Sequence, residues 1–440
     1  MKHYFYELAS AIDRLKQNDE VILSNFEGEE SDFVRINHAT IRQAGHVSQH
    51  ELRLRLIRGP KQMSTSLVLM GLMSQDIEQC LAALDGMRQA LPFIPDDPYL
   101  AFASEIRSSE HEPANELPPH QQLVGEILGS AHGTDLVGIY AGGSIYRGFA
   151  NTLGQRNWFA TDTFNFDFSL YLHQDKAVKS GLAGFSWKPH EWQRVFGKAK
   201  EELALLKHPA KTLQPGKYRV YLAPQALEEI VDIMGWGGFG IKAHHTKQSP
   251  LLKMHEEGLT LNPAVSLSED IAEGLSPSFD DLGYLRPGRT PLIQQGKHAQ
   301  HLVCARSAKE FGIKTNGANS RESPESLSMA PGSLPTAAAL RELGTGILIN
   351  NLWYLNYSDR NSCRMTGMTR FASFWVEAGK IMAPINVMRF DESIYRIFGP
   401  QLIALTKEAQ FIPSASTYER RSTVSRRLPG ALIDQFQFTL

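Results

Sequence analysis

Cysteine is scarce in this sequence, which contains only Cys80, Cys304 and Cys363. The three residues lie far apart and form no Cys-x-x-Cys pair, so the sequence predicts neither a disulfide framework nor a zinc ribbon. This usage is typical of a reducing compartment. Residues 1–7 also contain no apolar segment of the kind that a signal peptide carries. We therefore expect a cytoplasmic protein.

A long hydrophobic run and an excess of one charge are missing too. The longest apolar run, 67–73, is far shorter than the roughly 20 residues that a membrane helix requires. The 45 basic and 47 acidic side chains give a net charge of −2, so the sequence predicts no binding to nucleic acid or to a membrane. We expect the basic pairs 420–421 and 426–427 to lie on a solvated surface.

Motifs of nucleotide and serine-hydrolase chemistry are also absent. No G-x-G-x-x-G run follows an expected strand, and the sequence has no Walker loop and no G-x-S-x-G elbow. The sequence therefore predicts no nucleotide cofactor.

The first half of the sequence mixes strand and helix patterns. Leu52, Leu54 and Leu56 alternate with Arg53 and Arg55, which is typical of a sheet with one solvated face. Further strands are expected at 21–24, 32–42, 66–72, 136–146, 158–163 and 167–172. Helices are expected at 4–17, 121–131 and 192–206. Another helix is expected after Ser74, its N-cap, with Ile77, Leu81 and Leu84 as its apolar stripe.

The segment 208–216 contains two prolines and marks the expected domain boundary. A strand at 218–222 and a helix from 225 to about 234 follow it. Loops are expected to dominate 235–319, with a strand at 302–304, and further strands are expected at 346–354, 364–370, 373–376 and 431–438. Because 440 residues exceed one typical core, we predict two domains. These are an N-terminal mixed domain with an antiparallel sheet (1–207) and a β-rich C-terminal domain (208–440), together an α+β fold.

Several segments resemble the TldD/PmbA family of bacterial peptidase-like proteins. The run 365–381, which contains Thr-Gly-Met-Thr-Arg and ends in Glu-Ala-Gly-Lys-Ile, is similar to the family's Thr-Gly-x-Thr-Arg run and the strand after it. The segments 33–43, 147–154, 324–332 and 428–436 resemble other family segments in the same order. The resemblance thus spans nearly the whole chain.

Zinc-binding members of this family carry His-Glu-x-x-x-His on the helix after the opening strand of the second domain, and a cysteine near the C-terminus. Here Asp232 and Gly237 stand at the two histidine positions and Ile233 at the glutamate position, while the last cysteine is Cys363. The resemblance therefore points to the metal-free PmbA/TldE-like branch, with no cofactor in this chain. It implies a zinc-bearing TldD-like partner, or a homodimer where that partner is absent.

The residues also leave two alternatives open. His244, His245 and His255 are close enough in sequence to form a metal site on an irregular loop, which would make the chain a self-sufficient hydrolase. Otherwise they are ordinary surface or core residues. The pairs 228–229 and 256–257 are expected on solvated helix faces, because adjacent carboxylates on a helix diverge.

Binding is the chemistry that remains. Trp353, Tyr354, Arg370 and Phe374 lie on expected strands and either pack in the core or form the wall of a groove that adds an extended peptide to a sheet edge. A groove of this kind also fits a peptide-binding regulatory module. By resemblance, we expect a non-catalytic subunit of a cytoplasmic metalloprotease complex that shapes a channel for unfolded or modified peptides.

Overall fold

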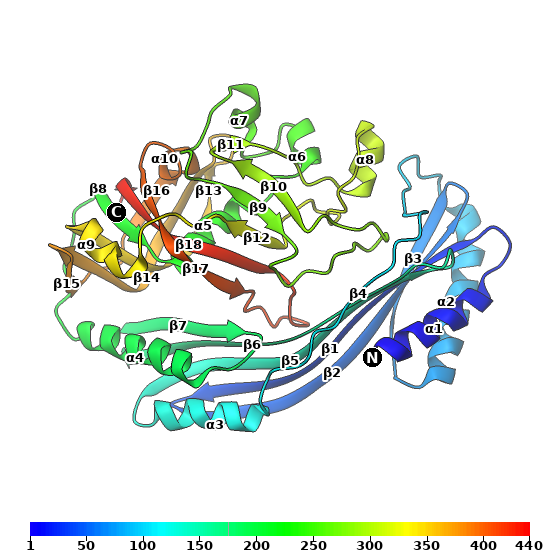
Figure 1. The fold of residues 1–440 in the computed structure, drawn as a ribbon, viewed down its shortest axis with the longest axis horizontal. Coiled ribbons are helices and arrows are strands. Elements are labelled where there is room, and N and C mark those ends of the chain that lie inside the picture. The colour runs from blue at the N-terminus through cyan, green and yellow to red at the C-terminus, as the bar shows by residue number, and fades with distance from the viewer. Residues whose placement is uncertain (175) are drawn as a thin grey trace.

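Long antiparallel strands of the first half form a curved sheet that runs the length of the molecule (Figure 1). The computed structural model describes residues 1–174 and 176–440. Among these residues, the sheet has the order β3-β2-β1-β5-β6-β4, with β7 added beside β6. Its strands are β1 Val21–Asn37, β2 Thr40–Arg58, β3 Lys61–Val68, β4 Ser109–His111, β5 Asp135–Asn151, β6 Arg156–His173 and β7 Lys176–Gly184.

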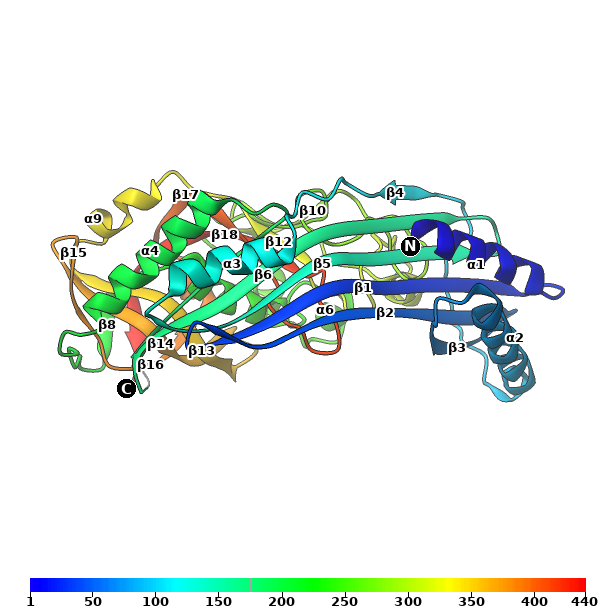
Figure 2. The same ribbon diagram turned by 90° about the horizontal axis from the view of Figure 1, so that it is seen from below.

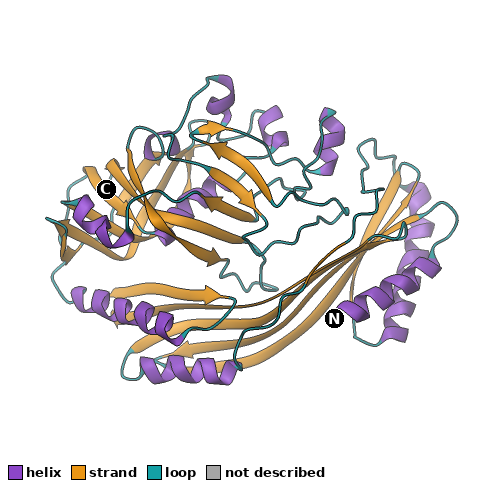
Figure 3. Ribbon diagram, in the orientation of Figure 1, coloured by secondary structure: helices purple, strands orange, loops and turns teal. Residues whose placement is uncertain are grey.

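Four helices cover one face of this sheet, two at each end (Figure 2). They are α1 Lys2–Leu15, α2 Met73–Ala90, α3 His120–Ala131 and α4 Pro189–Leu205. The alternation in β2 explains the first pair, because Leu52, Leu54 and Leu56 are fully buried in one apolar cluster with residues of α1 and α2. The remaining part of the chain packs on the opposite face (Figure 3).

The second half forms a larger mixed sheet. Along its main path the described strands follow the order β11-β10-β9-β12-β18-β16-β14-β13-β8, with β15 beside β14 and β17 beside β18. The bounds are β8 Gly216–Leu222, β9 Leu267–Asp270, β10 Arg289–Gln294, β11 Lys297–His298, β12 Ser326–Met329, β13 Gly346–Asp359, β14 Arg364–Glu377, β15 Lys380–Pro384, β16 Arg389–Ser393, β17 Leu402–Pro413 and β18 Ser425–Phe438. The helices are α5 Pro224–Gly235, α6 Ile241–His245, α7 Leu252–Glu256, α8 Ala305–Phe311, α9 Ala339–Leu343 and α10 Ile394–Ile397. This arrangement confirms the predicted α+β fold.

Several local predictions differ from the structure. The expected strand 32–42 contains the turn between β1 and β2, where His38 and Ala39 have positive φ angles of 48° and 53°. Helix α2 has Leu72 rather than Ser74 as its N-cap, and Leu81 points to solvent while Cys80 is buried. The expected strand 302–304 is reduced to one isolated bridge at Leu302.

The predicted domain division at 207 and 208 falls between α4 and β8. One apolar cluster contains residues from both sides of that point, among them Phe166 and Trp192 before it and Tyr221, Phe374 and Leu432 after it. The two halves thus share part of their core. The division into two domains remains a prediction. None of the described helices has both the length and the apolar character of a membrane span.

Candidate functional site

Helix α5 occupies the place where the sequence resemblance puts the family's zinc ligands. The helix begins at Pro224. Its apolar face packs against β13 and β18 in the large core, where Ile233 is 2% exposed. Asp232, one position earlier, forms an ion pair with Arg426 of β18 at 2.6 Å. Gly237 lies beyond the end of the helix with a φ of 79°. At the family's ligand positions this chain therefore has an ion-paired carboxylate (Asp232), a side chain in the core (Ile233) and a residue without a side chain (Gly237).

Side chains from the end of β13 and from the turn after it pack against the end of α5. The Tyr357 hydroxyl donates a hydrogen bond to the carbonyl of Ile233 at 2.6 Å. The Arg360 guanidinium donates to the carbonyls of Trp236 and Gln248. The Ile233 carbonyl in the last turn of α5 is thus paired, and Arg360 lies close to the backbone at Gly237.

A groove of about 130 Å³ lies beside the exposed edge of α5. Its walls are formed by Gln225, Glu228 and Glu229 of α5, residues 179–183 of β7 and residues 410–413 of β17. Burial, then the charges of Asp232 and Glu229, raises the pKa of Glu228 to about 8. Across the groove, Asp167 pairs with Lys179 at 3.4 Å. The predicted solvated position of the 228–229 pair is thus wrong for Glu228, which is half-buried and whose pKa is raised.

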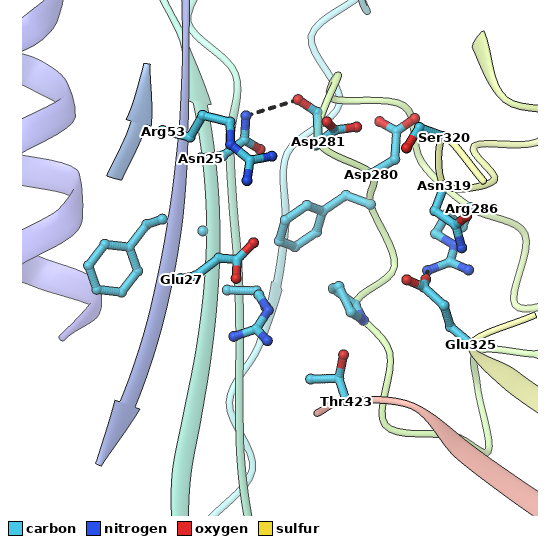
Figure 4. A pocket seen from close by; sticks show the side chains of 15 residues that line it. Asn25, Glu27, Arg53, Asp280, Asp281, Arg286, Asn319, Ser320, Glu325 and Thr423 are labelled. Carbon is cyan, nitrogen blue, oxygen red and sulfur yellow. Dashed lines mark hydrogen bonds and ion pairs between the residues drawn. The ribbon is translucent and has the colours of Figure 1, made fainter. Parts of the chain in front are cut away.

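A second cavity, of about 210 Å³, lies between the long sheet and loops of the second half (Figure 4). It is lined by charges of both signs, from Glu27, Arg53, Asp280, Asp281, Arg147, Arg286 and Glu325. Arg286 is held by Glu269 at 2.8 Å and by Glu325. Burial, then the charge of Asp281, raises the pKa of Asp280 to about 7. The Asn25 amide donates to the carbonyl of Asp281 at 3.0 Å, which ties this loop to β1.

The sequence predicted that the basic pairs near the end of the chain lie on a solvated surface. The structure does not place them there. Arg420 joins Glu27 and Glu51 of the long sheet at 2.6 Å each. Arg421 is 6% exposed and donates to the carbonyls of Gly143 and Thr163. The loop between β17 and β18 is therefore docked on the long sheet by buried and half-buried arginines. No local sequence pattern signals this, because the acceptors lie more than 250 residues away.

Two of the three histidines proposed as an alternative metal site lie together. His244 of α6 and His255 of α7 have ring centroids 4.0 Å apart, and His301 joins them at 4.9 Å and 4.8 Å. His298 of β11 completes the group at 3.9 Å from the His255 ring. His245 points elsewhere and stacks on Phe311. The sequence pattern missed His298 and His301, because they are more than 40 residues from His255.

The residues proposed to bind peptide are separated. Phe374 is fully buried in the shared apolar cluster, so it contributes to the core and cannot touch a peptide at the surface. Trp353 and Tyr354 are exposed on β13, and Arg370 of β14 lies over the Phe371 ring. None of the four residues lines either of the two cavities. For Trp353, Tyr354 and Arg370, a role in peptide binding stays a prediction.

Comparison with known proteins relates this architecture to one family. Residues 215–440, more than half of the chain, match the family model of the PmbA/TldA metallopeptidase C-terminal domain. A search of curated proteins found no match.

Solved structures share the whole fold. TldE from Thermococcus kodakarensis is 12% identical with a TM-score of 0.79, over 99% of this chain and 100% of that chain. A candidate modulator of a DNA gyrase from Thermotoga maritima is 15% identical with a TM-score of 0.76, over 99% of both chains. A third similar structure, from Bacteroides thetaiotaomicron, is 16% identical with a TM-score of 0.75, over 99% and 98%. With the family match over its second half and this fold over its length, the chain belongs to the TldD/PmbA family of metallopeptidase-related proteins.

Proposed function

We propose that this chain is a non-catalytic, TldE-like subunit of a TldD-type zinc metalloprotease complex that processes or degrades peptides. The proposal rests on the residues of α5 and its end that stand at the family's zinc-ligand positions. Asp232 is committed to Arg426, Ile233 packs in the core and Gly237 follows the helix with a positive φ. Zinc needs three protein ligands and an open position for water, and these residues do not fit that requirement.

The groove beside α5 supports a role in holding substrate. Among the named strands of the described residues, β7 pairs only with β6 and β17 only with β18. Segment 332–334 bridges the other edge of β17 at Thr406, so that edge stays open only farther along, toward 410–413. Residues 180–183 of β7 and 410–413 of β17 line the groove. An extended peptide can pair with such an edge through its main chain, which gives affinity without strict sequence preference. In a complex, this groove forms part of the channel that leads to the zinc of the partner subunit.

Reconstitution tests this proposal. The chain is purified alone and together with a TldD-like subunit that carries His-Glu-x-x-x-His, and cleavage of an unfolded model peptide is followed. We expect cleavage only by the mixture, and its loss when the first histidine of the partner's motif is replaced. Cleavage at an unchanged rate by the TldD-like subunit alone would contradict a shared channel.

The groove itself is tested by filling it. Ala183→Trp places a bulky side chain among the lining residues of β7. We expect the cleavage rate of the mixture to fall more than tenfold while the two subunits still copurify. Ala82→Trp on the exposed side of α2 is the matched control and should leave the rate unchanged.

A self-sufficient hydrolase is the second candidate function, and the histidine cluster is the observation that favours it. A hydrolytic metal site also needs a free coordination position and a general base. Glu256, next to His255, is instead paired with Lys247 at 3.1 Å. Cleavage by the chain alone that is lost in His255→Ala would support this candidate over the subunit. Tight peptide binding without any cleavage, alone or in the mixture, would instead support a regulatory module.

A further inference from the structure

Four imidazole rings from separate segments meet at one point of the second half. His244 comes from α6, His255 from α7, His298 from β11, and His301 from the segment that follows it. Adjacent rings in the group have centroids between 3.9 Å and 4.9 Å apart. One ring nitrogen of each of His244, His255 and His301 lies within 4.8 Å of the other two.

Each of the four rings also has a buried nitrogen without a hydrogen-bond partner. These atoms are Nδ1 of His244, Nε2 of His255, Nε2 of His298 and Nδ1 of His301. An unpaired buried polar atom is uncommon in a folded protein and costs free energy. Four of them in one cluster, one from each ring, indicate a shared partner that is not part of the chain.

The chemistry of the rings selects the kind of partner. The unpaired buried atoms are all imidazole nitrogens, and they face one another across stacked and tilted rings. A cation that accepts one lone pair from each ring would satisfy these nitrogens together. Neutral imidazole is a preferred ligand of zinc, copper and nickel ions.

We propose that His244, His255, His298 and His301 bind one divalent transition-metal ion, and that zinc is its natural occupant. In tetrahedral zinc sites the metal–nitrogen distance is about 2.0–2.1 Å. The ligand nitrogens of His244, His255 and His301 lie up to 4.8 Å apart and therefore move inward when the ion binds. The His298 ring, which adjoins those of His255 and His301, moves with them. The proposal does not depend on the function proposed for α5, and it departs from the expectation that this chain holds no metal.

The site is structural, because four protein ligands complete a tetrahedron and leave no position for water. The elements that carry the ligands are short, since α6 and α7 have five residues each and β11 has two. Helices of this length are not stable on their own. The ion therefore ties α6, α7 and the β10–β11 hairpin into one unit, in a region that the sequence predicted as loops.

Metal titration of the full chain tests this proposal. The protein is purified without a His-tag, stripped with a chelator, and titrated with zinc by calorimetry, with bound metal then measured by mass spectrometry. We expect about one equivalent of zinc. Less than a tenth of an equivalent, or binding only at millimolar zinc, would mean an adventitious ion only and would overturn the proposal.

Matched variants separate this site from the other histidines. We expect His255→Ala and His301→Gln each to weaken zinc binding at least 100-fold, while both keep the circular dichroism of the wild type. His245→Ala removes a neighbouring ring that stacks on Phe311 and should bind zinc within twofold of the wild type. Equal losses in His245→Ala and His255→Ala would overturn the assignment.

Cobalt substitution tests the geometry independently of these variants. A four-histidine tetrahedral site gives intense visible absorption when cobalt(II) replaces zinc. Weak absorption of the six-coordinate kind would mean that water occupies part of the site, and would overturn the closed structural arrangement.

Discussion

Arg421 has all its polar contacts with residues that are distant in sequence. Its guanidinium donates to the Ser31 hydroxyl, to the carbonyl of Gly143 and to Thr163, while its backbone N–H donates to Glu29. We expect Arg421→Met to lower the free energy of unfolding by about 3 kcal/mol, because Ser31, Gly143 and Thr163 lose the guanidinium as a donor. Urea denaturation checks this.

Arg321→Met is the matched control for Arg421→Met. Arg321 is exposed, so its replacement should change the free energy of unfolding by less than about 0.5 kcal/mol. Equal effects of the two substitutions would contradict the docking role of Arg421.

Glu228 makes stability depend on pH. Burial raises its pKa from 4.5 to about 8, so the folded state binds the proton more tightly than the unfolded state does. Its favourable contribution is complete below about pH 4.5 and is lost as the pH rises toward 8. We expect the stability of the wild type relative to Glu228→Gln to fall by roughly 2 kcal/mol between pH 4.5 and 8.5.

Denaturation at the two pH values measures this change. Glu201→Gln, on the exposed side of α4, is the control and should track the wild type at both values. A constant difference between wild type and Glu228→Gln would show that the groove does not bury this carboxyl.

Single residues also show how far the sequence could go. The alternation of Leu52, Leu54 and Leu56 predicted a buried face, because a strand of period two must place every second side chain on one side. The burial of Arg421 and the gathering of His298 with His255 could not be predicted. Both depend on contacts between distant segments, which leave no periodic pattern.

At the scale of elements, α5 explains why the family's motif cannot simply be restored. Ile233 is 2% exposed in the large core, so Ile233→Glu should cost about 3 kcal/mol or more by burying a carboxylate without a partner. Ile233→Leu keeps the volume and should cost less than about 1.5 kcal/mol. Urea denaturation measures the free energy of unfolding of both variants. Nearly equal values for Ile233→Glu and Ile233→Leu would contradict the inward orientation of Ile233.

The lengths of the strands were the least predictable property of the elements. The sequence indicated separate strands at 136–146, 158–163 and 167–172, whereas β5 and β6 run unbroken for 17 and 18 residues. The predicted break at 164–166 lies inside β6, where Phe164 and Phe166 are buried and the strand pairs with both β5 and β7. Pairing with neighbouring strands on both sides accounts for the unbroken β5 and β6.

At the scale of the whole molecule, the two halves meet through apolar and charged contacts together. The shared cluster contains Trp192 and Phe374, and Arg420 and Arg421 add ion pairs and hydrogen bonds to the long sheet. The α+β class was predictable from the mixture of patterns along the sequence. The shared core was not, because a boundary rich in proline suggested two independent units.

The most direct test of the proposed function is the rate of peptide cleavage by the chain alone and with a TldD-like subunit, at saturating zinc. We expect no cleavage by the chain alone, and cleavage by the mixture that requires the partner's His-Glu-x-x-x-His motif. Sustained cleavage by the chain alone, lost when His255 is replaced by alanine, would contradict it.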